Sequence, residues 1–243
     1  MIEAEGVAVP LAELRIVRAD HGVCVRLGSR LNAPRVDLVE HVLGALGGLG
    51  VREGVAVIVE GGEVPLLDGG AALFVEALRS LGLAETAPRG IVARAFSAVI
   101  DGSTYRLEPG AVSRVAVDIA FSHPAVGAQS AELTHDPDDF ARRIAPARTF
   151  GFAADWPVLL AAGRARGVDP RSVLVFDEEG VHPSSQPAAR EEPARHKLLD
   201  LLGDLTLFGG PFRGTFHAVR PGHARTHAFL RSALAAGALV VAP

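Results

Sequence analysis

A histidine and two aspartates follow one another at intervals of four residues in the segment 196–204, HKLLDLLGD. Residues four positions apart lie on the same face of a helix, so His196, Asp200 and Asp204 are predicted to form one polar stripe. A histidine and a carboxylate one turn apart can supply two ligands to a divalent metal ion. On an ordinary helix this spacing more often marks a solvated ion pair, so a metal site needs a third ligand from elsewhere.

The pattern around His196 recurs around His41. Offsets of two, five and seven residues carry Leu, Leu and Gly in both segments: Leu43, Leu46 and Gly48 in the first, Leu198, Leu201 and Gly203 in the second. We interpret this as an internal duplication, although leucines also recur by chance on amphipathic helices. The duplication makes His41 the third ligand beside His196 and Asp200. Three protein ligands leave a position open for water, the pattern of catalytic zinc, and Fe²⁺ is also compatible with this set.

Two further residues could move protons at such a site. Glu40 precedes His41 and could take a proton from an attacking water without binding the metal; a solvent-facing charge is the alternative. His223 follows Pro221-Gly222 at the start of the last predicted helix and could protonate a leaving amine, although a plain helix-start residue fits equally well. The other histidines have no partner at an informative spacing and are interpreted as structural: His21, His123, His135, His182, His217 and His227.

Composition limits the classes of protein to consider. The 243 residues carry a net charge of −4, which argues against a nucleic-acid partner. Cys24 is the only cysteine, so a thiolate zinc cluster is excluded and a reducing compartment is expected. The sequence shows no secretory signal and no apolar run long enough for a membrane span, so we expect a cytoplasmic protein. Lys197 is the only lysine.

Hydrophobic periodicity predicts the elements that position these residues. In the first part we expect a hairpin of strands 13–17 and 22–27, a helix over 36–49, a strand over 55–60, and a helix over 68–81 capped by Asp68. After the polar stretch 84–90, which is the best boundary, we expect strands 91–100, 103–108 and 113–121, a helix 194–208, a strand 212–219 and a helix 222–236. The sequence thus predicts halves 1–86 and 90–243.

An apparent insertion, residues 151–182, interrupts the second half. It contains an apolar helix candidate, 156–165, and a hydrophobic strand, 173–176. A β-α-β flap that encloses an apolar ligand would fit this pattern, and so would a surface embellishment.

Several ordered motifs resemble the UDP-3-O-acyl-N-acetylglucosamine deacetylase family. They are VEHVLGALGGLG at 39–50, EVPLLDGGAA at 63–72, FV at 74–75, HPA at 123–125, ARTFGF at 147–152, RHKLLD at 195–200, GDL at 203–205 and PGHA at 221–224. The resemblance implies an α+β fold of two similar halves, each a β-sheet with helices, with the helices sandwiched between two outer sheets. It implies a zinc enzyme that deacetylates a UDP-amino sugar carrying an acyl chain in lipid A biosynthesis, and we expect a monomer.

The resemblance also implies roles for individual residues. The family's zinc ligands fall on His41, His196 and Asp200, and its general base falls on Glu40. Its oxyanion-stabilising threonine matches Thr149, its active-site lysine matches Lys197, and its second catalytic histidine, held by an aspartate, matches His223 with Asp204. Phe150 and the segment 151–182 correspond to the region that grips the acyl chain.

The chain departs from the family pattern where substrate is contacted. The opening Gly-Leu-His-Ser/Thr-Gly turn is replaced at 8–12, the flap stretch is altered at 167–173, and Leu-Asn-Asn after PGHA reads Arg225-Thr226-His227. Residues 28–35 lead almost directly into the first helix, so a small capping insert is shortened. A paralogous zinc deacetylase acting on another N-acetylated sugar or amide is therefore a second hypothesis. A non-catalytic binder of a nucleotide sugar or acyl chain is a third.

Overall fold

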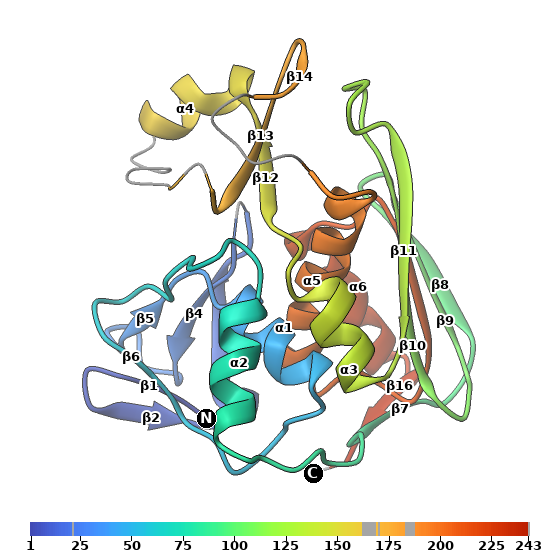
Figure 1. Ribbon diagram of the computed structural model, residues 1–243. Helices are drawn as coiled ribbons and strands as arrows, with labels where there is room; N and C mark the ends of the chain where they lie inside the picture. Colours follow the sequence, from blue (N-terminus) through green and yellow to red (C-terminus); the bar gives the residue numbers. More distant parts are fainter. Residues whose placement is uncertain (21, 162–168, 170, 183–187, 243) are drawn as a thin grey trace.

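Helices fill the middle of the molecule and β-sheets cover them on two sides (Figure 1). The computed structural model describes residues 1–20, 22–161, 169, 171–182 and 188–242. The mixed α+β fold and its sandwiched helices confirm the predicted architecture. Among the described helices, none combines the length and the apolar character needed to cross a membrane. The division into domains 1–86 and 90–243 stays a prediction.

Two small sheets form the outer layer of the first half. One has the order β2-β1-β6 and the other β3-β4-β5. Their strands are β1 (Ile2–Ala4), β2 (Val7–Val9), β3 (Leu14–Arg18), β4 (Cys24–Leu27), β5 (Arg35–Val36) and β6 (Val57–Val59). The predicted hairpin is confirmed by antiparallel β3 and β4, in which Ile16 pairs with Val25. His21, in the predicted turn, lies outside the described residues.

The first helix, α1 (Glu40–Gly48), begins four residues later than predicted. Val36 instead belongs to β5 and pairs with Val25. Leu38 has a φ of 58°, outside the right-handed helical region, so the helix cannot extend back through it. The prediction of a start at 36 was wrong because Val36 and Val39 are fully buried like helix residues while belonging to a strand and a link.

The second half has one five-stranded sheet of order β11-β10-β15-β9-β8. Its strands are β8 (Phe96–Ile100), β9 (Ser103–Glu108), β10 (Ser113–Ala120), β11 (Ala128–Thr134) and β15 (Gly214–Val219). The predicted single strand 91–100 was wrong: β7 (Gly90–Val92) pairs instead with β16 (Leu239–Val241) near the C-terminus. Alternate residues of β10, Val115, Val117 and Ile119, are buried against the helices, whereas Arg114 and Asp118 point outward.

The remaining helices confirm the predicted order of elements with shifted ends. They are α2 (Ala72–Ser80), α5 (Glu192–Leu207) and α6 (His223–Ala235). Four short elements were not predicted: α3 (Pro137–Asp139), the π-helix η2 (Phe140–Ile144), and the 3₁₀ helices η1 (Leu11–Glu13) and η3 (Ala153–Asp155). The helix predicted from residue 68 begins at Ala72, because residues 68–71 form a loop from which Asp68 Oδ2 accepts the Ala72 N–H at 3.2 Å. A helix, strand and helix follow in each half: α1-β6-α2 and α5-β15-α6.

The predicted β-α-β flap is present and projects beyond the helical layer (Figure 1). Strand β12 (Thr149–Phe152) runs parallel to β13 (Val173–Asp177), which pairs with the short β14 (Gly180–Val181). Helix α4 (Trp156–Ala161) lies between β12 and β13 in the sequence. The helix predicted over 156–165 is confirmed as far as Ala161, and its last four residues lie outside the described residues.

Helices α1 and α5 cross so closely that glycine is required at the contact. A Cβ on Gly203 would fall well inside 3.0 Å of the Glu40 carbonyl oxygen, and a Cβ on Gly44 would lie 2.7 Å from Leu199 Cδ1. Neither residue could therefore be larger without separating the helices. The close crossing brings the rings of His41 and His196 to a centroid distance of 5.0 Å.

Candidate functional site

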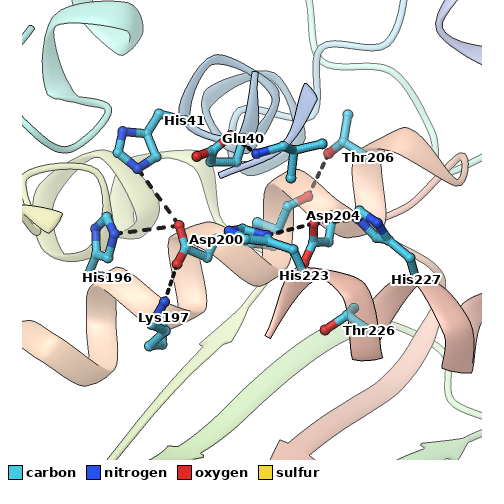
Figure 2. Close-up of polar contacts among 12 residues, drawn as sticks. Glu40, His41, His196, Lys197, Asp200, Asp204, Thr206, His223, Thr226 and His227 are labelled. Carbon is cyan, nitrogen blue, oxygen red and sulfur yellow. Dashed lines mark hydrogen bonds and ion pairs between the residues drawn. The ribbon is translucent and has the colours of Figure 1, made fainter. Parts of the chain in front are cut away.

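His41, His196 and Asp200 meet at the crossing of α1 and α5 (Figure 2). One ligand atom from each lies within 4.8 Å of the others, and all three residues are buried. Asp200 Oδ1 lies 3.5 Å from His196 Nε2 and 3.7 Å from His41 Nε2. The structure thus brings together the three ligands that the helical spacing and the repeat predicted.

The geometry of this cluster fits a zinc ion. Ligand atoms around tetrahedral zinc lie roughly 3.4 Å apart, close to the two measured separations. His196 Nδ1–H donates to the Ala147 carbonyl at 3.1 Å, which leaves Nε2 directed toward the cluster. A metal-binding histidine usually has its second nitrogen fixed in this way.

The protonation states of the ligands also suit metal binding. Burial, followed by the charge on His196, lowers the pKa of His41 to about 3, so its imidazole is neutral at physiological pH. Burial alone would raise the pKa of Asp200, but Lys197 and His196 outweigh it and hold the pKa below its usual value. Neutral imidazole and carboxylate are the forms that bind zinc.

Lys197 contacts the second carboxylate oxygen of Asp200. Its Nζ donates to Asp200 Oδ2 at 2.7 Å, on the side away from the histidines (Figure 2). Burial alone would lower the pKa of Lys197, but the Asp200 carboxylate raises it overall. The ammonium also lies 5.7 Å from the centre of the Phe150 ring. A single ammonium can donate three hydrogen bonds, so Lys197 can contact both Asp200 and a substrate.

Glu40 lies beside His41 at the first turn of α1, and its carboxylate is buried rather than solvent-facing. Oε2 accepts the Val23 N–H at 2.9 Å, which fixes the side chain against β4. Burial raises the pKa of Glu40, with the nearby charge of His223 acting against the shift. A buried carboxylate with a raised pKa is a suitable proton acceptor near neutral pH.

His223 and Asp204 form the next layer of the site (Figure 2). His223 Nδ1 donates to both oxygens of Asp204, at 2.9 Å and 3.1 Å. Burial alone would lower the pKa of His223, but Asp204 outweighs it and raises the pKa to about 9. The imidazole is therefore protonated at neutral pH and its Nε2–H is available as a proton donor.

His227 also contacts the Asp204 carboxylate. This contact was not predicted from the sequence. His227 Nε2 donates to Asp204 Oδ1 at 2.7 Å, and the ring is 1% exposed. The interpretation of His227 as a residue without an informative partner was therefore wrong. The overlooked signal is its spacing of four residues from His223, which places both rings on one face of α6.

Thr149 and Phe150 approach the cluster from the flap. Thr149 begins β12, two residues after the carbonyl that accepts from His196, and its N–H donates to Gly69 O at 2.7 Å. The ring of Phe150 packs edge-on against that of His196 at 6.2 Å. The roles implied for these residues stay predictions.

A buried ion pair anchors the start of this strand. Arg148 Nε donates to Glu192 Oε1 at 2.8 Å, with both side chains largely buried. Glu192 is the first residue of α5, so the pair joins the flap to the helix that carries His196. Breaking one partner of a buried pair is costly, which keeps the two elements in register.

An aromatic cavity of about 670 Å³ lies beside the flap. Phe121, Phe152 and Phe176 line it, together with His123, whose Nε2 donates to the Asp177 carbonyl. Phe150 packs against Phe176 at 6.2 Å and against His196 at the same distance. One aromatic side chain therefore connects the cavity with the metal-ligand cluster.

Comparisons with known proteins show which family the sequence resembles. A family model described as UDP-3-O-acyl N-acetylglycosamine deacetylase matches residues 5–235. A deacetylase of that name from Myxococcus xanthus is 36% identical over 234 residues, covering 95% of this chain and 73% of the relative. Relatives of the same name from Oleidesulfovibrio alaskensis and Brucella ovis are each 36% identical, over 87% and 83% of this chain and 69% and 71% of their own lengths.

Proposed function

Because the chain belongs to the UDP-3-O-acyl-N-acetylglucosamine deacetylase family, we propose that it hydrolyses the N-acetyl amide of UDP-3-O-acyl-N-acetylglucosamine to acetate and a free amine. It is a zinc-dependent deacetylase of lipid A biosynthesis. The observation that carries the proposal is the buried cluster of His41, His196 and Asp200, flanked by one carboxylate and one protonated histidine.

The metal ligands prepare the amide for attack. A zinc ion held by His41, His196 and Asp200 would supply Lewis acidity toward the amide carbonyl and make water a better nucleophile. Lys197 holds the remaining oxygen of Asp200, so the carboxylate is kept in one orientation. Asp200 Oδ1, which faces both histidines, remains for the metal ion.

Glu40 takes the proton from the attacking water in this proposal. Its raised pKa makes it a stronger base than a solvent-exposed glutamate, and the Val23 N–H holds it in place. General-base action of this kind typically contributes about 10²–10⁴-fold to the rate. The departing amine takes its proton from a second group, and the proton held by Glu40 afterwards restores that group.

His223 provides the proton for the nitrogen of the departing amine. It is held by Asp204 and is positively charged at neutral pH, so it also stabilises negative charge that develops on the carbonyl oxygen. In our proposal Thr149 and Lys197 also stabilise the negative charge on the carbonyl oxygen. Thr149 precedes Phe150 in β12, and the Lys197 ammonium lies 5.7 Å from the centre of the Phe150 ring.

The aromatic cavity accommodates the acyl chain of the proposed substrate. Its Phe lining offers apolar surface, and Phe150 connects it to the metal-ligand cluster. Burial of each methylene there contributes up to about 0.8 kcal/mol of binding energy. The protein is therefore expected to discriminate between substrates with short and long acyl groups.

An acetate-release assay tests the proposal directly. The zinc-loaded protein should release acetate from UDP-3-O-acyl-N-acetylglucosamine much faster than from UDP-N-acetylglucosamine or N-acetylglucosamine. Release from the simple sugars alone would overturn the substrate assignment and favour a paralogous deacetylase. The predicted monomer is checked by light scattering on the same preparation.

A further inference from the structure

We propose that His227 is a positioning residue of the deacetylation reaction: by donating to Asp204, it fixes the carboxylate that orients His223. This inference rests on the proposed role of His223 as proton donor. His227 does not reach the substrate in this proposal, because Asp204 lies between it and His223 (Figure 2). It acts through the carboxylate alone.

The hydrogen bonds show how the two histidines share one carboxylate. Asp204 Oδ1 accepts from His227 Nε2 at 2.7 Å and from His223 Nδ1 at 2.9 Å, and Oδ2 accepts from His223 at 3.1 Å. Asp204 is 2% exposed, so bulk water cannot stabilise its charge. Two donors on the same buried carboxylate therefore replace the hydration that burial removes.

The surroundings of His227 determine its tautomer. Its Nδ1 is buried without a hydrogen-bond partner among the described residues, and its ring packs against that of Phe208 at 5.5 Å. A proton on Nδ1 would leave an unpaired N–H in an apolar setting, which costs more than a bare lone pair. His227 therefore carries a proton on Nε2, which is directed at Asp204 Oδ1.

Fixing the carboxylate matters because its last torsion is intrinsically soft. A terminal carboxylate torsion has a broad energy profile, so a single partner leaves the plane of Asp204 free to rotate. His227 approaches from α6 one turn beyond His223, and both donors are therefore held by one rigid helix. Rotation of the carboxylate would turn the His223 ring away from the position where it can protonate the amine.

Substitutions that separate the donor from the ring test this proposal. His227→Phe keeps an aromatic ring but removes the N–H, and His227→Gln keeps a donor at similar reach. For the zinc-loaded protein we expect kcat to fall roughly tenfold in the Phe variant with KM unchanged, and to recover most of that loss in the Gln variant. Equal losses in both variants, or an unchanged kcat in the Phe variant, would overturn it.

A double variant distinguishes positioning from a general loss of structure. If His227 acts only through His223, His227→Phe should have no further effect in a His223→Ala background. A full additional tenfold loss there would assign His227 a purely structural role and contradict the proposal. Thermal melting of each variant with zinc bound shows whether the fold is retained.

A spectroscopic test on the wild-type protein is independent of turnover. Histidine ¹⁵N spectra of the zinc-loaded protein should show a proton on His227 Nε2 and a proton on His223 Nδ1 that is protected from exchange. A His227 Nε2 without a proton would overturn the proposal, because the ring could not then donate to Asp204. No substrate is present in this experiment, so its result does not depend on the substrate assignment. The substrate assignment fails only if the wild-type protein releases no acetate from UDP-3-O-acyl-N-acetylglucosamine.

Discussion

The crossing of α1 and α5 and the flap of β12, α4 and β13 meet at Phe150, but the helices α1 and α4 are packed in opposite ways. Every residue of α1 is buried, and glycine replaces larger side chains where its backbone meets α5. In α4 none of the six residues is buried, and Val158 is 71% exposed. Reaction chemistry needs fixed atoms, whereas an acyl chain needs only apolar surface, so we infer that the crossing sets the reaction and the flap sets the substrate.

Removing a ligand at the crossing should have the largest effect. His196→Ala leaves two protein ligands and should reduce bound zinc from about one ion per chain to nearly none, with loss of acetate release. Zinc content by atomic spectroscopy measures this. The matched control is His217→Ala, because His217 pairs with Asp118 on the outer face of the large sheet and should keep its zinc. Equal zinc loss in both variants would contradict the site.

Glu40→Gln should abolish most activity without removing the metal. The amide preserves the size of the side chain but cannot accept the proton, so kcat should fall about 10²–10⁴-fold while zinc content stays unchanged. Parallel zinc and acetate measurements separate the two effects. If zinc is lost together with activity, Glu40 supports the metal site rather than the proton transfer.

The charge on His223 should set the basic limit of activity. Burial would lower its pKa, but Asp204 raises the pKa to about 9. Because the protonated form donates the proton, kcat/KM should fall as pH rises through this value. His223→Gln should lose roughly 10²-fold in kcat/KM and the basic limb should disappear. A limb that persists in this variant belongs to another group.

Glycine substitutions compare the packing of the two regions directly. At the crossing, Gly203→Ala places a Cβ against the Glu40 carbonyl and should lower the free energy of unfolding by about 1–3 kcal/mol or more. In the flap, Gly151→Ala meets no atom within 4 Å and should change it by less than about 0.5 kcal/mol. Denaturant titration of both variants checks this, and similar losses would show that the flap is packed as tightly as the crossing.

The sequence predicted the crossing better than its surroundings. His196 and Asp200 could be found because a helical period of 3.6 places them on one face, and His41 could be found through a repeat. Strand β11 was missed because only Leu133 of its seven residues is buried, so it lacks an apolar alternation. His227 was missed although it lies four residues from His223 on α6, because sequence spacing does not reveal that this helix packs against Asp204 of α5.

The resemblance and the physical pattern contributed different parts of the site. Spacing alone left Glu40 and His223 open to ordinary helix roles. The resemblance implied chemical roles, and the low exposure of both side chains beside the cluster favours them. The start of α1 could not be predicted because Val36 and Val39 are as apolar as the residues of the helix. The positive φ of Leu38, which prevents the helix from starting earlier, cannot be recognised from the residue types. Boundaries depend on such local conformations, whereas the identity of the helix depends on its whole length.

The smallest effect should come from the exposed face of the flap. Val158→Ser removes apolar surface from a residue that packs against little, so the free energy of unfolding should change by less than about 0.5 kcal/mol. If α4 contributes to acyl binding, KM for a long-acyl substrate should rise about threefold. KM for a short-acyl substrate and kcat for both substrates should stay unchanged. A fall in kcat for both substrates would mean that the flap also positions the reacting atoms, and the division of labour between flap and crossing would then fail.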